Sequence, residues 1–194
     1  QIKEEMFVSK EENCILFSIQ SNAPFDLIFD IIDFEEELLT QQTSFDKDQI
    51  VQKNIYQDQT SYYTNISWDS KKTYEKLSND KIIFKGLTEI TFFCDITFNP
   101  LPKDLSRKTY NEIKERHILQ HKMKYNKVEL DLVNNKERLR SIDDVFEEME
   151  TTQIIPPVLY EKMYDASRYI IQSMSGEALP NLQGIWSGDF SPAW

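Results

Sequence analysis

The sequence contains two histidines, His117 and His121, which stand four residues apart in the stretch HILQH. If this stretch is helical, both imidazoles lie on one face, as in a two-histidine metal site. Ile118 stands where the zinc-protease pattern needs a glutamate, and the sequence shows no evident third ligand. The alternative is a pair of histidines that pack against or cap the helix. We predict that alternative, with no metal and no cofactor.

Carboxylates are a second group that could do chemistry. Hydrolysis of a glycosidic bond uses two carboxyl groups held across the sugar, about 5 to 9.5 Å apart. The chain carries 33 aspartates and glutamates, so pairs at short spacing arise by chance, and none has the surroundings of a pocket. The triplet Asn65-Ile66-Ser67 is a glycosylation signal, but it lies inside a predicted strand and carries little weight.

The last sixteen residues, LPNLQGIWSGDFSPAW, concentrate glycines, prolines, amides and tryptophans in one segment. One interpretation is a packed, turn-rich loop that closes the end of a helical domain. The other is the rim of a sugar site, because tryptophan faces stack on pyranose rings and amides hydrogen-bond their hydroxyls. Both interpretations stay open on the residues alone.

Charge and composition narrow the possible partners. The net charge is −11, and an acidic surface repels phosphate and anionic lipid, so we expect neither nucleic acid nor membrane as a partner. Hydrophobic residues make up 40% of the chain, which is enough for a core. No signal peptide is recognisable after Gln1, which favours a cytoplasmic location. Cys14 and Cys94 lie in apolar runs and are predicted to be buried free thiols, with a disulfide as the alternative.

The first hundred residues show the alternation of apolar and polar residues that is typical of half-buried strands. The predicted strands are Cys14–Gln20, Pro24–Asp33, Ser61–Trp68, Lys81–Gly86 and Glu89–Phe98. The stretch SNA at 21–23 predicts a turn between the first two. Together these strands predict an antiparallel sheet or sandwich.

Helical periodicity replaces this pattern after the prolines at 100 and 102. The spacing predicts a helix over about 104–126, a second helix that Ser141 caps, and a third from Pro157 to a glycine cap at Gly176. The predicted buried stripe of the third helix consists of Leu159, Met163, Ala166, Ile170 and Met174.

Four blocks of the sequence resemble glycoside hydrolase family 95, the α-L-fucosidase family. LPNLQGIW is similar to the family signature LPANLQGIWN, and LYEKMYDASRYIIQSMS resembles the helix before it, with Arg168 and Tyr169 in register. RHILQHKMKYNKVELDL resembles a third block whose leading histidine matches His117, although Gln120 and His121 replace its Asp-Tyr pair. KEEMFVSKEENCILFSI is similar to a strand pair of the family's N-terminal domain.

The resemblance implies an α+β chain with an antiparallel β-sandwich over 1–100, a helical linker over 101–153 and the start of an (α/α)6 catalytic barrel over 154–194. It implies an inverting exo-hydrolase of terminal α-L-fucosyl or related bonds, with a glycan substrate. It also implies that the catalytic residues lie in a missing C-terminal part, so this chain alone is expected to be inactive. Asn181, Gln183 and Trp186 match the signature and are the expected substrate contacts. The alternative is a non-catalytic module that binds carbohydrate or protein.

Overall fold

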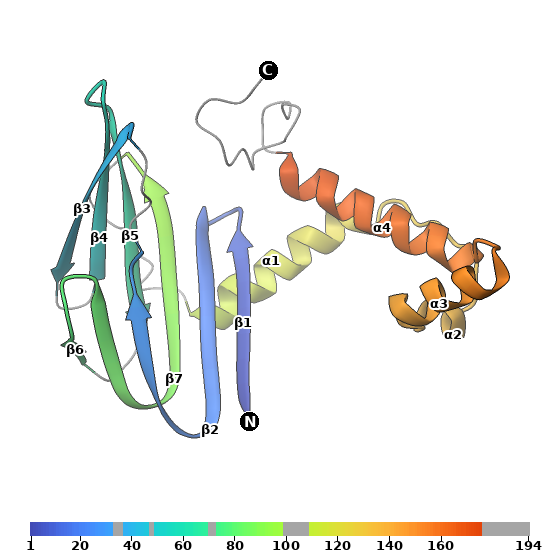
Figure 1. The fold of residues 1–194 in the computed structure, drawn as a ribbon, viewed down its shortest axis with the longest axis horizontal. Coiled ribbons are helices and arrows are strands. Elements are labelled where there is room, and N and C mark those ends of the chain that lie inside the picture. Colours follow the sequence, from blue (N-terminus) through green and yellow to red (C-terminus); the bar gives the residue numbers. More distant parts are fainter. Residues whose placement is uncertain (33–36, 47–48, 70–72, 99–108, 176–194) are drawn as a thin grey trace. The chain divides into compact units, whose positions relative to one another are not determined.

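The computed structural model describes residues 1–32, 37–46, 49–69, 73–98 and 109–175. The chain divides into two compact units, Gln1–Leu119 and Gln120–Trp194 (Figure 1). The first unit is a β-sheet with the beginning of a helix, and the second is helical. The described residues therefore form an α+β chain, as the sequence predicts.

The first unit is built on one seven-stranded sheet in which every pair is antiparallel. The strands are β1 (Ile2–Ser9), β2 (Cys14–Asp30), β3 (Leu39–Asp46), β4 (Gln49–Tyr56), β5 (Ser61–Asp69), β6 (Tyr74–Lys76) and β7 (Lys81–Thr97). Their order across the sheet is β1-β2-β7-β5-β4-β3, with β6 beside β7. The antiparallel sheet is confirmed, whereas its description as a sandwich stays a prediction.

The two central strands, β2 and β7, are each 17 residues long, and both correct the sequence prediction. The predicted turn at 21–23 is wrong, because these residues belong to β2 and bulge opposite Thr88 of β7. Lys81–Gly86 and Glu89–Phe98 are likewise one strand up to Thr97, interrupted by Gly86 at φ 61°. The Gly86 amide donates to the Asp26 carboxylate at 2.8 Å. A bulge accommodates Pro24, Gly86 and the extra residues 21–23, of which the sequence pattern assigned only 21–23 to a turn.

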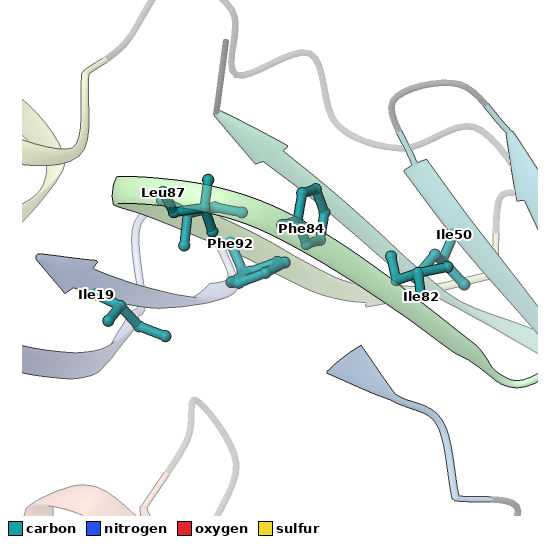
Figure 2. Packing of buried hydrophobic residues seen from close by; sticks show 7 residues of the cluster. Ile19, Ile50, Ile82, Phe84, Leu87 and Phe92 are labelled. Carbon is teal, nitrogen blue, oxygen red and sulfur yellow. The ribbon is translucent and has the colours of Figure 1, made fainter. Parts of the chain in front are cut away.

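The main hydrophobic core lies where the two halves of β7 meet their neighbours. Ile82 and Phe84 precede the bulge and Ile90 and Phe92 follow it, yet all four belong to one buried cluster. Figure 1 shows both long strands bending sharply, which brings the two halves to the same core. Ile19 of β2, Ile50 of β4 and Leu87 complete the cluster (Figure 2). The aromatic strand β5 contributes Trp68, whose ring lies edge-on to Phe84 at 5.3 Å.

Strands β3 and β4 are missing from the sequence prediction because polar residues make up most of β3 and half of β4. In β4 only Ile50 and Asn54 are buried, and the Gln41 side-chain amide of β3 donates to Asn54 Oδ1 at 2.7 Å. Strand β4 pairs with β5 and β3 pairs with β4, and these pairings place both strands in the sheet. The pattern of one strand by itself does not specify its pairing partner.

Helix α1 (Tyr110–Tyr125) lies within the helix predicted over 104–126, whose first residues to 108 are outside the described residues. It packs on the sheet through Ile113, which is buried with Cys14 and Leu16. Lys114 forms an ion pair with Glu5 of β1 at 2.6 Å. These contacts fix the start of α1 within the first unit.

The second unit contains the end of α1 with α2 (Asn135–Arg138), α3 (Ile142–Thr152) and α4 (Pro157–Met174). The predicted Ser141 cap is confirmed, since its hydroxyl accepts from the Asp144 amide at 3.1 Å. Val145 of α3 packs against Val158 and Leu159 of α4.

The predicted buried stripe of α4 is largely wrong in this structure. Leu159 is buried, but Met163 is 59% exposed and Ile170 is 47% exposed. The residues of α4 that are buried are Val158, Leu159 and Glu161, because they face α3 and the segment before α2. The predicted cap Gly176 lies outside the described residues.

Both cysteines are free thiols, as predicted. Cys14 is buried, and Cys94 is half-buried opposite Ile15. Cys94 pairs with Ile15, which follows Cys14 in β2, and adjacent residues of a strand point to opposite faces. The two thiols therefore lie on opposite faces of the sheet. Burial, with the adjacent Asp95 charge, raises the pKa of Cys94 to about 11.

Candidate functional site

The predicted substrate contacts Asn181, Gln183 and Trp186 lie outside the described residues. The part of the candidate site that the structure describes is helix α4, which leads into this segment, together with its supports. Two of its residues, Arg168 and Tyr169, are those in register with the family pattern.

Arg168 joins α4 to the end of α1. One guanidinium nitrogen donates to the Tyr125 carbonyl oxygen at 2.5 Å, and another donates to the Val128 carbonyl oxygen. Tyr125 is the last residue of α1, so its carbonyl has no partner within the helix. A cation at this end also interacts favourably with the helix dipole. The guanidinium lies over the rings of Tyr125 at 4.7 Å and Tyr164 at 5.5 Å, which holds it in place.

Aromatic side chains extend this contact. His121 stacks on Tyr125 at 5.2 Å between ring centroids and meets the edge of Tyr169 at 5.9 Å. The Tyr125 hydroxyl donates to the Asp165 carbonyl oxygen at 2.9 Å. Tyr169 is 55% exposed, so one of its faces is free to meet solvent or another group. His121 therefore acts as a packing residue here, as predicted.

His117 also packs. Its ring stacks on Phe7 of β1 at 4.9 Å, within the first unit. Among the residues that the structure describes, no group of three or more His, Cys, Asp or Glu could hold a metal ion. None of the helices in the described ranges is long and apolar enough to cross a membrane.

Glu161 is the one buried acid of α4, at 3% exposure, and sequence reasoning missed it. Its carboxylate accepts from the backbone amides of Leu132 at 2.7 Å and Val133 at 2.8 Å, and from Arg138 Nε at 2.9 Å. The hydrogen bond from Arg138 outweighs burial and lowers the pKa of Glu161 to about 2. A general acid needs a raised pKa, so Glu161 serves as an ionised anchor.

Arg138 completes this network. It also donates to Asp131, and both carboxylates raise the pKa of its guanidinium. Lys162 Nζ donates to the Arg138 carbonyl oxygen at 3.0 Å. The segment before α2 is therefore bound to the first turns of α4. The sequence carries a signal for the burial of Glu161, because this residue stands three positions after Val158 and so lies on the apolar side of the helix.

Comparison with known proteins identifies this part of the chain. Residues 109–194 match the glycosyl hydrolase family 95 catalytic domain. A stretch of 93 residues is 31% identical to a protein of Aspergillus niger described as probable alpha-fucosidase A, and the alignment covers 46% of this chain and 11% of that relative. The matched residues are thus similar to a glycoside hydrolase catalytic domain. The matching family is glycoside hydrolase family 95, and the resemblance seen in the motifs is confirmed over these residues.

The match begins at residue 109, which is the residue before α1. It includes residues 109–153, which are most of the predicted linker over 101–153, and the boundary at 153 stays a prediction. Arg168, Tyr169 and the signature segment all fall inside the matched range.

Proposed function

We propose that this chain is part of an inverting exo-glycoside hydrolase that releases terminal α-L-fucose or a related sugar from glycans. The observation that carries the proposal is the match of residues 109–194 to the family 95 catalytic domain. The name of the relative from Aspergillus niger supports the fucosidase type. The chain aligns with 11% of that relative, which favours a larger protein as the working enzyme.

In an inverting mechanism one carboxylic acid protonates the leaving oxygen, and a second group drives water onto the opposite face of the sugar. We place both groups outside this chain, as the resemblance implies. Glu161 itself does not fit the role of the general acid, because a buried carboxylate held ionised by Arg138 cannot donate a proton at neutral pH.

Within this chain we assign substrate contact to Asn181, Gln183 and Trp186. Amides hydrogen-bond sugar hydroxyls, and an indole stacks on a pyranose face. The supports of α4 would set the direction in which the chain enters this segment. Glu161 near the start of α4 and Arg168 beyond its middle hold the helix to the residues before it.

The exposed apolar side chains of α4 support its role as the start of an (α/α)6 barrel. Tyr160, Met163 and Ile171 are 50%, 59% and 59% exposed. Large exposed apolar patches usually mark surfaces that another element covers. We propose that further helices of the same catalytic domain cover them.

The test compares two proteins, the 194-residue chain and a longer product that carries it. We expect the longer product to release fucose from 2′-fucosyllactose and the 194-residue chain to release none. A Trp186→Ala variant of the longer product should raise KM, whereas Trp68→Phe, a conservative change in the β core, should not. Turnover by the short chain would overturn our placement of the catalytic groups. Absence of turnover by the longer product would overturn the hydrolase itself.

The alternative function is a non-catalytic module that binds carbohydrate or protein. One observation favours it, namely that the β-sheet unit is compact and has its own core. Trp68 of the aromatic strand β5 does not supply its binding surface, since that ring packs against Phe84 and Tyr74. Glycan binding that survives removal of the residues after Leu119 would favour this alternative.

A further inference from the structure

A polar hollow of about 500 Å³ lies on the face of the sheet against which α1 packs. Its floor is a set of neighbouring side chains on three strands. Ser18 of β2, Thr91 of β7 and Asp69 of β5 stand in one row across the sheet, and Gln20 pairs with Glu89 in the next row. Residues two apart along a strand share a face, so all five side chains lie on the same side.

The bulge and the start of α1 form the walls. Gly86, Leu87 and Thr88 line one side, and Thr109, Tyr110 and Asn111 line the other. These last three residues are held to the sheet because Ile113, in the same first turn of α1, is buried against Cys14 and Leu16. The hollow therefore belongs entirely to the first unit and depends on the bulge that lengthens β2 opposite Thr88.

The chemistry of the lining excludes an anion and fits a neutral polyol. Asp69 and Glu89 repel anions, and the N-terminus of α1 is already capped by Thr109 and Glu112. The remaining polar groups are hydroxyls and amides, which donate and accept hydrogen bonds in both directions. Carboxylates are strong acceptors for hydroxyl groups. Thr91 donates to Ser18 at 3.4 Å, which is long enough for a ligand hydroxyl to compete.

A second hollow of about 720 Å³ shares Gln20, Thr88 and Glu89 with the first. It adds Lys3 of β1 and Asn22 of the bulge to the polar surface. Both volumes fall within the range of small-molecule sites. The shared residues join the two hollows into one continuous polar surface.

We propose that this surface, the bulge groove, binds a neutral oligosaccharide, with Gln20, Thr91 and Asn111 as hydrogen-bonding residues. The choice of a carbohydrate among neutral polyols rests on the proposed function. The bulge groove would be a second glycan contact on the β-sheet unit, in addition to the signature segment at 179–186. Binding to exposed polar side chains is weak, with a dissociation constant on the order of 1 mM.

The test is a titration of the isotope-labelled 194-residue chain with 2′-fucosyllactose, followed by amide NMR signals. We expect shifts at Gln20, Thr88 and Thr91. Gln20→Ala should weaken binding about fivefold, the loss expected for one hydrogen bond. Gln42→Ala is the matched control, because Gln42 is also an exposed strand glutamine, on β3, and it should leave the affinity unchanged.

Thr91→Val provides a second variant that removes one hydroxyl with little change of shape, and it should weaken binding similarly. Absence of shifts at these residues, or equal effects of Gln20→Ala and Gln42→Ala, would overturn the proposal. Binding that is lost on Trp186→Ala and kept on Gln20→Ala would place the sugar at the signature segment and also overturn it. If the bulge groove binds 2′-fucosyllactose but the longer product does not hydrolyse it, the proposed function fails and this inference stands.

Discussion

The contact between α1 and the sheet can be tested by shortening Ile113 to alanine. Ile113 is 1% exposed and packs against Cys14 and Leu16, with Phe7, Phe93 and Tyr110 around it. The substitution removes three buried carbons at about 0.8 kcal/mol each and leaves a cavity, so the expected loss of unfolding free energy is about 2 to 5 kcal/mol.

The matched control is Leu119→Ala. It also removes three carbons from α1, but Leu119 is 60% exposed. We expect it to cost less than about 1 kcal/mol. Helix propensity does not explain the difference, since alanine is at least as good a helix former as either residue.

The assay is urea unfolding monitored by the fluorescence of Trp68, in a background with Trp186→Phe and Trp194→Phe. With a slope of about 2 kcal/mol per M urea, Ile113→Ala should lower the midpoint by at least about 1 M. Equal midpoints for Ile113→Ala and Leu119→Ala would refute the reasoning. They would show that α1 is not anchored by Ile113 and that the wall of the bulge groove is not fixed.

Four further predictions follow from single side chains. The pKa of Glu161 is lowered to about 2 from 4.5, so its stabilising contribution should be present above pH 4.5 and lost as the pH falls toward 2. Glu161→Gln should flatten this acid dependence of the urea midpoint, and an unchanged slope would contradict the assignment. Arg168→Lys should speed amide hydrogen exchange at the end of α1, because one ammonium cannot replace the two guanidinium contacts and the stacking on Tyr125; unchanged protection would count against it. The pKa of the Cys94 thiol is raised to about 11, so in the folded chain it should react slowly with a thiol reagent at pH 8. Unfolding in urea removes the burial and should restore the reaction rate of an ordinary thiol. Asn65 is 1% exposed, so the folded chain cannot carry a glycan there, and the folded fraction from a glycosylating host should have the unmodified intact mass.

The sequence by itself determined features that depend on neighbours along the chain. Alternation over Glu89–Phe98 predicted a half-buried strand, and the serine-x-x-aspartate spacing at Ser141 predicted a helix start. The signature LPNLQGIW predicted the family that the comparisons confirm. Each of these signals lies within a few residues, because strand period, helix capping and sequence motifs are local properties.

The tertiary structure decided what depends on partners far away in the chain. Whether 21–23 forms a turn or a bulge depended on continued pairing of β2 with β7 beyond Thr88. Glu161 became an ionised anchor because Arg138, 23 residues earlier in the chain, reaches it. Likewise, the apolar stripe of α4 told us that the helix is amphipathic, but burial of Met163 or Ile170 requires a partner element. Pairing and burial are set by residues distant in sequence, so local patterns cannot specify them.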